Sequence, residues 1–164
     1  MVTQTMIMEK SHLSYCDIHL HVKMLAFKIQ ASNWMPSVIV GVSRGGMLPA
    51  TLLSHAWRLP MKALNVSLRD HAVLQPDQAP WLEELIQSGK RVLVMDDIND
   101  SGATINWIKQ DWQNRLSSTS FSDHVRFAVL LNKPTSTEKP EYTSREITTE
   151  KLDTWWIFPW EHLE

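Results

Sequence analysis

The stretch of residues 91–104 constrains the fold more than any other part of this chain. An apolar run, residues 92–95, leads directly into the adjacent acids Asp96 and Asp97. A third acid follows at Asp100, and then a loop of small residues, 101–104. The apolar run is typical of a short buried strand, and helical spacing of apolar residues begins at Ile105. The pattern therefore predicts a strand, a polar loop and a helix in immediate succession.

The same alternation runs along the rest of the chain. We predict strands at residues 38–42, 61–68, 92–95 and 125–131, and a weak strand near 146–148. Helical spacing of apolar residues predicts helices at 15–32, 47–57, 81–88 and 105–115. Polar, aperiodic composition predicts loops at 69–80, 116–122 and 135–141. Strands that alternate with helices indicate an α/β fold, a mostly parallel central sheet flanked by helices.

Composition narrows the classes of function. The 164 residues fit a single domain spanning 1–164. A net charge near −2 gives no electrostatic case for binding nucleic acid, and no apolar run approaches membrane-spanning length. Cys16 is the only cysteine, which excludes an internal disulfide and favours a reducing, cytoplasmic location.

Polar residues follow three of the predicted strands, at 43–46, 96–104 and 132–133. Ligands of parallel sheets bind beyond the carboxyl ends of the strands, so these segments predict one site. Acids suit sugar hydroxyls or a metal ion, and amides at a helix start suit a phosphate. Ser43, Arg44 and the two following glycines are a candidate second anion loop. The simpler alternative for 96–104 is a turn in which Asp100 or Ser101 caps the helix.

Residues 96–104, Asp-Asp-Ile-Asn-Asp-Ser-Gly-Ala-Thr, resemble the phosphoribosyl-diphosphate (PRPP) motif of type I phosphoribosyltransferases. Within that family the chain is most similar to the bacterial xanthine-guanine (purine) enzymes. Residues 42–46 resemble the family's pyrophosphate loop, and Asp70-His71 stands where its mobile catalytic loop, about 69–80 here, begins. Lys133-Pro134 and the tail, about 150–164, resemble its purine-binding segments. The resemblance implies a small C-terminal base-binding hood beside the sheet.

The resemblance also implies a role for each site residue. The phosphate and sugar contacts would be Ser43, Arg44 and Gly45 for diphosphate, Asp96 and Asp97 for the ribose hydroxyls directly or through Mg²⁺, and Ser101, Gly102, Ala103 and Thr104 for the 5′-phosphate. The base-side contacts would be Asp100 as general base, Lys133 on the 6-oxo group, Trp155 stacked on the purine, the Trp156 backbone at its edge and Glu161 near a second Mg²⁺. The chain departs from the family at Asn99 and Ser101, where an apolar residue and threonine are more usual.

These roles predict Mg²⁺-dependent transfer of a phosphoribosyl group from PRPP to guanine, xanthine or hypoxanthine. One alternative is the same reaction on another base, and another is a non-catalytic sensor of PRPP or a nucleotide. Lys133 as a solvated lysine, and Trp156 and Trp160 as packing residues, are the simpler interpretations of those side chains. The resemblance and the apolar tail also favour a homodimer or homotetramer.

Overall fold

A computed structural model of the chain describes residues 9–66, 79–116 and 118–162, without the side chains of 118–120. Its centre is a five-stranded sheet in the order β3-β2-β4-β5-β6, with every pair of neighbours parallel. The strands are β2 (Val38–Ser43), β3 (Met61–Asn65), β4 (Val92–Asn99), β5 (Val125–Asn132) and β6 (Tyr142–Glu146). The predicted α/β fold is therefore confirmed.

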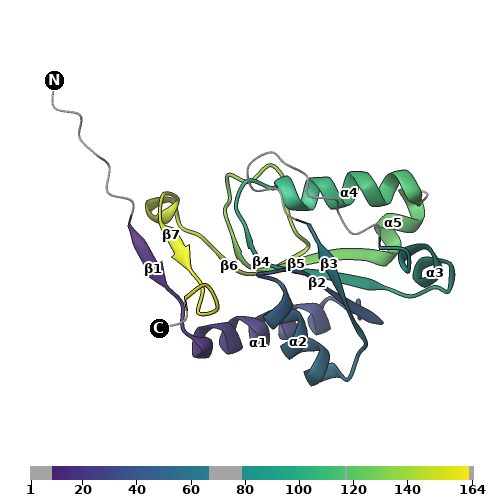
Figure 1. Ribbon diagram of the computed structural model, residues 1–164, viewed down its shortest axis with the longest axis horizontal. Coiled ribbons are helices and arrows are strands. Elements are labelled where there is room, and N and C mark those ends of the chain that lie inside the picture. Colours follow the sequence, from purple (N-terminus) through teal and green to yellow (C-terminus); the bar gives the residue numbers. More distant parts are fainter. Residues whose placement is uncertain (1–8, 67–78, 117, 163–164) are drawn as a thin grey trace.

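Helices cover both faces of the sheet (Figure 1). On one face lie α1 (Tyr15–Ala31) and α2 (Met47–Trp57), and on the other α4 (Ala103–Arg115), with α3 (Leu82–Gln87) and α5 (Ser118–His124) at the right-hand end of the molecule in this view. Alternate residues of β4 serve the two faces, because Leu93 and Met95 join the core around α1, whereas Val92 and Val94 join the core around α4. This two-sided burial explains why the strands appear in the sequence as continuous apolar runs.

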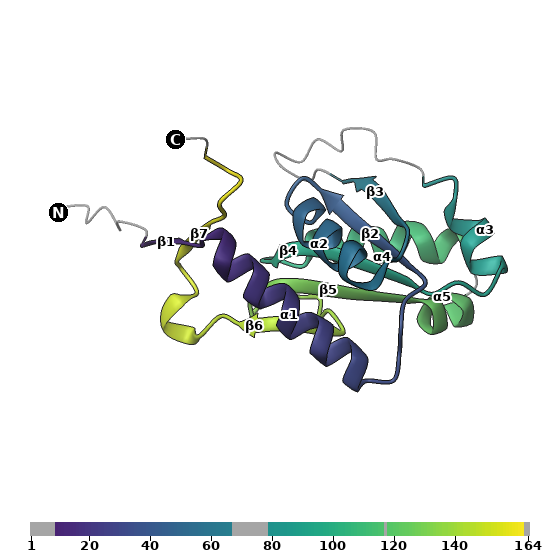
Figure 2. The ribbon, with the colours of Figure 1, turned by 90° about the horizontal axis from the view of Figure 1, so that it is seen from below.

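A second, two-stranded sheet lies at one end of the molecule, beside the start of α1 (Figures 1 and 2). It pairs β1 (Lys10–His12) with β7 (Trp155–Ile157) in parallel, and the short 3₁₀ helix η2 (Thr149–Lys151) precedes β7. The N–H of Leu13 extends the pairing by donating to Ile157 O at 2.9 Å. The C-terminal tail is thus held by residues from the other end of the chain, which the sequence did not predict.

Several predicted boundaries were wrong. β4 continues four residues past Met95, because residues 96–99 still pair with β5, from Asp96 opposite Val129 to Asn99 opposite Asn132. Part of the predicted connection at 116–122 is the helix α5. The last strand of the main sheet ends at Glu146, where the weak strand was predicted to begin. The predicted strand end at 67–68 and most of the predicted mobile loop, including Asp70 and His71, lie outside the described residues.

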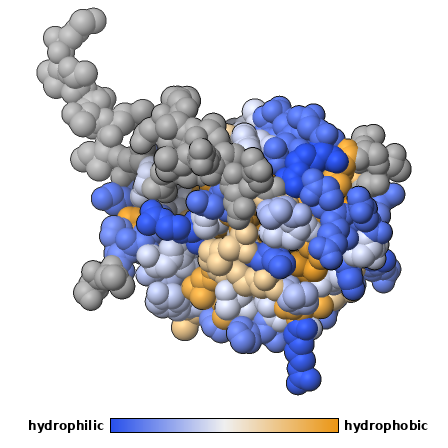
Figure 3. Space-filling view, turned by 45° about the vertical axis from the view of Figure 1, so that its right-hand side comes forward, coloured by the Kyte–Doolittle hydropathy of each residue, from blue (hydrophilic) through white to orange (hydrophobic). Residues whose placement is uncertain are grey.

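The surface in Figure 3 is mostly hydrophilic, with apolar residues gathered in the lower middle of that face. Among the described residues, no helix is both long enough and apolar enough to cross a membrane.

Candidate active site

Three adjacent strands carry the predicted site residues to one edge of the sheet. β2, β4 and β5 are neighbours and run parallel, so residues 43–46, 96–104 and 132–133 meet at their carboxyl ends. A hollow of about 80 Å³ lies there, lined among others by Asp96, Asp100 and the loop residues Ser101, Gly102, Ala103 and Thr104. The prediction that the segments share one edge is confirmed, while the roles of the individual residues stay predictions.

The loop of residues 101–104, called the phosphate loop below, is shaped by Gly102. This residue has φ +91°, and a Cβ there would lie 2.6 Å from Thr137 Oγ1 and 2.8 Å from Ser136 Oγ. Any other residue would be both strained and too large. Helix α4 begins at Ala103, so the N–H groups of its first turn have no partner within the helix. Those N–H groups and the positive end of the helix dipole can hold a phosphate.

The adjacent acids Asp96 and Asp97 lie partly buried at the end of β4. Each carboxylate accepts a hydrogen bond from the next main-chain N–H, Asp97 N to Asp96 Oδ1 at 2.9 Å and Ile98 N to Asp97 Oδ1 at 2.7 Å. Burial, followed by the charge of Asp97, raises the pKa of Asp96 well above its usual value. Burial is also the main cause that raises the pKa of Asp97 to about 6, with the charge of Glu161 adding to it. The site therefore concentrates negative charge that a cation would relieve.

The candidate diphosphate loop touches these acids directly. Gly45 lies so close to Asp97 that a Cβ on it would overlap the Asp97 carboxylate. Ser43 Oγ donates to Asn65 Oδ1 at 3.1 Å, and the peptide bond between Ser43 and Arg44 is cis. Arg44 is exposed. The two candidate anion loops therefore flank Asp96 and Asp97, as expected for a ligand phosphorylated at both ends.

On the other side of the phosphate loop, the predicted base contact and the predicted general base touch each other. Lys133 Nζ lies 2.6 Å from Asp100 Oδ1. Lys133 is mostly buried, with 19% of its side chain exposed, whereas Asp100 is 64% exposed. The ion pair places an ammonium donor and a carboxylate acceptor side by side, and the edge of an oxopurine offers the complementary carbonyl and N–H.

The tryptophans of the tail have different environments. Trp155 is 52% exposed on β7. Trp156 is 8% exposed and its ring lies against Arg145, whose Cζ is 5.7 Å from the ring centroid. Trp160 stacks on Phe158 at a centroid distance of 5.0 Å. The packing interpretation of the Trp156 and Trp160 side chains is confirmed, and Trp156 has only its backbone to offer a ligand.

Glu161 lies at the join between the tail and the acids. Its carboxylate accepts a hydrogen bond from Phe158 N at 3.2 Å, and its charge acts on Asp97. Among the described residues, no three His, Cys, Asp or Glu side chains are grouped to hold a metal by themselves. Mg²⁺ is commonly bound by one or two carboxylates, with waters and substrate phosphates as the other ligands. Asp97 and Glu161 therefore fit an ion that arrives with the substrate.

The sequence placed Asn132 at the site but did not identify residues 136–138, which pack against the phosphate loop and Asn99. The available signal was Asn99 itself, an amide at the end of a strand that is otherwise apolar up to Asp96.

Comparisons with known proteins agree with this geometry. The model of the phosphoribosyl transferase domain family matches residues 14–164. A xanthine-guanine phosphoribosyltransferase of Cereibacter sphaeroides is 27% identical over 157 residues, covering 92% of this chain and 86% of the relative. The crystal structure of a purine phosphoribosyltransferase from Pyrococcus horikoshii is similar with a TM-score of 0.69 and 25% identity, covering 94% of this chain and 96% of that one.

A third similar structure is a protein of Neisseria gonorrhoeae with bound ppGpp, which has a TM-score of 0.72 and 25% identity over 96% of this chain and 92% of that one. The parallel sheet, the hollow beyond β4 and the family match over nearly the whole chain lead to one conclusion. The chain belongs to the phosphoribosyl transferase domain family and is a phosphoribosyltransferase.

Proposed function

We propose that the protein transfers the 5-phosphoribosyl group of PRPP to a 6-oxopurine, guanine, xanthine or hypoxanthine, in a Mg²⁺-dependent reaction of purine salvage. The observation that carries the proposal is the contact between Lys133 and Asp100, 2.6 Å apart and one residue from the phosphate loop. This pair offers a donor for the 6-oxo oxygen and an acceptor for a ring N–H. The names of the similar purine enzymes support the same assignment.

Each residue of the site has a separate task in this reaction. The amides of Ser101, Gly102, Ala103 and Thr104 hold the 5′-phosphate. Asp96 and Asp97 bind the ribose hydroxyls, and Ser43, Arg44 and Gly45 hold the diphosphate. The base lies between Lys133 and Trp155, with its edge at the Trp156 backbone.

The chemical step replaces one bond at ribose C1 by another. The purine nitrogen donates its electron pair to C1 while the bond from C1 to the diphosphate oxygen breaks, and the diphosphate leaves with that pair. Asp100 accepts the proton that the purine loses. Mg²⁺ bound near Asp97 and Glu161 would supply positive charge to the leaving group.

Incubation with PRPP, Mg²⁺ and each oxopurine tests the proposal, with nucleoside monophosphate and diphosphate measured in equal amounts. We expect turnover with at least one of guanine, xanthine and hypoxanthine. No product from any of the three would refute the proposal. Product from a pyrimidine or an unusual base alone would support the alternative acceptor.

The second candidate function is a nucleotide sensor, and one comparison favours it, the similar Neisseria protein with bound ppGpp. A guanine nucleotide with diphosphates at two positions carries anionic groups at two ends, and each of the two anion loops could bind one of them. Binding of ppGpp without any turnover of PRPP would favour the sensor, whereas competition between ppGpp and PRPP in an active enzyme would make the nucleotide an inhibitor.

We further propose a cytoplasmic homodimer or homotetramer. Light scattering of the purified protein tests the assembly, and a monomer at micromolar concentration would contradict it.

A further inference from the structure

The buried side chain of Asn99 connects the phosphate side of the site to the base side. Asn99 ends β4 directly opposite Asn132, the last residue of β5, and is 3% exposed. Its Nδ2 donates to Asn132 Oδ1 at 2.7 Å and to the main-chain oxygen of Glu138 at 2.7 Å. Both N–H bonds of this amide are therefore used inside the protein.

The direction of these bonds is fixed by groups that can only accept. The Glu138 oxygen is a carbonyl, and Asn132 Nδ2 donates to the Glu146 carboxylate at 2.8 Å. Asn99 must therefore present its NH₂ group, and Asn132 its oxygen, where the two amides meet. The result is a polar ladder across β4, β5 and β6, in which no apolar side chain could take the place of Asn99 without leaving Asn132 Oδ1 unpaired.

Asn99 also binds both ends of one short segment, residues 133–138, which we call the bridging segment. Its main-chain oxygen accepts from Lys133 N at 3.0 Å, while its side chain holds Glu138 O. Lys133, the first residue of the segment, is the partner of Asp100. One residue in the PRPP motif thus fixes the strand end that carries the candidate base contact.

The far end of the bridging segment rests on the phosphate loop. Thr137 donates to Ser101 O twice, from its N–H at 3.2 Å and from its hydroxyl at 2.9 Å. A Cβ on Gly102 would lie 2.7 Å from Glu138 N, so the segment leaves no room for a side chain at residue 102. Lys109 of α4 pairs with the Glu138 carboxylate at 2.7 Å. The segment is therefore in contact with the phosphate loop at one end and with Asp100 at the other.

We propose that Asn99 is a positioning residue that sets Lys133 and Asp100 at a fixed separation from the phosphate loop. The inference rests on the proposed purine phosphoribosyl transfer, in which one ligand spans both places. An apolar residue at 99 leaves the buried Asn132 Oδ1 without its donor and leaves Glu138 O with only the Ser136 hydroxyl at 3.1 Å, so the bridging segment shifts to recover water or another donor. A displacement of about 1 Å between binding groups is enough to lower a rate or an affinity by about 100-fold.

The test compares two ligands that share the phosphate and differ in the base. Dissociation constants of guanosine 5′-monophosphate and ribose 5-phosphate are measured by calorimetry. Their ratio reports how much affinity the contacts to the base add to the contacts to the phosphate and ribose. Incomplete folding weakens both ligands by the same factor and leaves the ratio unchanged. The ratio therefore separates positioning from a merely structural role.

For Asn99→Leu we expect the preference for the monophosphate to fall about tenfold, with ribose 5-phosphate binding nearly unchanged. For Thr137→Val, an exposed position where folding is not at risk, we expect a fall of about threefold through loss of the bond to Ser101. Asn114→Leu, exposed on α4, is the matched control and keeps the wild-type ratio.

An unchanged ratio in folded Asn99→Leu, or in Thr137→Val if the first variant does not fold, overturns the inference. A wild-type protein that binds both ligands equally would instead contradict the proposed function. The two failures are therefore distinguishable.

Discussion

The phosphate side and the base side of the site are built in different ways. The phosphate side comes from the ends of β2 and β4, inside the main sheet, and is so closely packed that Gly45 touches Asp97 and Gly102 touches the bridging segment. The base side combines Lys133 from the end of β5 with Trp155 from a separate two-stranded sheet. The two sides also differ in solvent exposure, since Trp155 on the base side is exposed and Gly102 on the phosphate side is buried.

On the proposed function, the phosphate and sugar would be bound by a closely packed, preformed surface, whereas base recognition would depend on how the tail is held against β1. Changes on the phosphate side should therefore impair every acceptor alike. Changes on the base side should discriminate among bases.

Asp100→Asn alters the residue where the two sides meet and should have the largest effect. Loss of a general base lowers kcat by about 10²–10⁴-fold, while PRPP affinity stays nearly constant because the phosphate loop is intact. Steady-state kinetics and PRPP titration measure both quantities. Asp123→Asn, exposed on α5, is the control and should leave kcat unchanged. A kcat within twofold of wild type in Asp100→Asn contradicts the base role.

Gly45→Ala tests the close packing of the phosphate side. The added methyl overlaps the Asp97 carboxylate and must displace it. We expect kcat/KM to fall about 100-fold for every acceptor, since a shift of about 1 Å misplaces sugar and diphosphate contacts alike. Gly89→Ala is the control for the loss of stability, because Gly89 has φ +72°, so alanine strains the backbone there although nothing lies within 4 Å of a Cβ. A selective loss for one base would show that the two sides are not separable.

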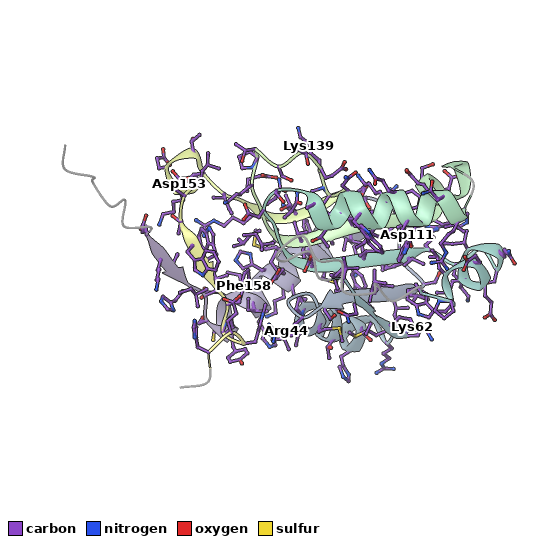
Figure 4. All side chains as sticks on the ribbon, turned by 45° about the horizontal axis from the view of Figure 1, so that its top comes forward. Arg44, Lys62, Asp111, Lys139, Asp153 and Phe158 are labelled. Atoms are coloured by element: carbon purple, nitrogen blue, oxygen red, sulfur yellow. The ribbon has the colours of Figure 1, made fainter. Side chains whose placement is uncertain are left out.

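Lys133→Met keeps the length of the side chain and removes its charge. We expect the KM for oxopurines to rise about 10–100-fold, the value of a hydrogen bond from a charged donor, with a much smaller change in the KM for PRPP. Lys139→Met in the same loop is the control, since Lys139 points outward in Figure 4 and is exposed. Equal losses for PRPP and base would assign Lys133 to the phosphate side.

Asp97→Asn should stabilise the ligand-free protein, because the folded state raises the pKa of Asp97 to about 6 from 3.8. Above pH 6 the folded protein bears the cost of an ionised, buried carboxylate, on the order of 3 kcal/mol, and below pH 4 it does not. The wild type therefore loses stability as pH rises from 4 to 7. The variant should unfold at a higher temperature than wild type at pH 7, measured by calorimetry without Mg²⁺, and at the same temperature near pH 3.5. A less stable variant at pH 7 would show that Asp97 contributes to the fold.

Trp155→Ala should have the smallest effect. Stacking of a base on an aromatic side chain contributes about 1–3 kcal/mol, and the exposed position of Trp155 favours the lower end, a five- to tenfold rise in the KM for the base. Phe27→Ala, which removes another exposed aromatic ring, is the control. If both variants behave like wild type, the tail does not recognise the base by stacking.

The sequence predicted the strand, loop and helix order of the phosphate side, because these residues are contiguous and the spacing of apolar residues changes between the strand and the helix. It failed to predict that Asp96 and Asp97 lie within β4. Polar residues at the end of a strand look like a loop in the sequence, and only the pairing with the neighbouring strand, here Val129 to Asn132, shows that the strand continues. The pairing of β7 with Lys10 to His12 was equally hidden, since three-residue strands far apart carry no periodic signal. The role of the bridging segment required coordinates, because Thr137 and Ser101 are 36 residues apart.

The most direct test of the proposed function is a crystal structure of the protein with a purine nucleoside 5′-monophosphate and Mg²⁺. The account predicts that the phosphate accepts hydrogen bonds from the amides of residues 101–104 and that the base lies between Lys133 and Trp155, with the Lys133–Asp100 ion pair opened. A phosphate bound at Ser43–Gly46 instead, or a base that contacts neither Lys133 nor Trp155, would contradict it.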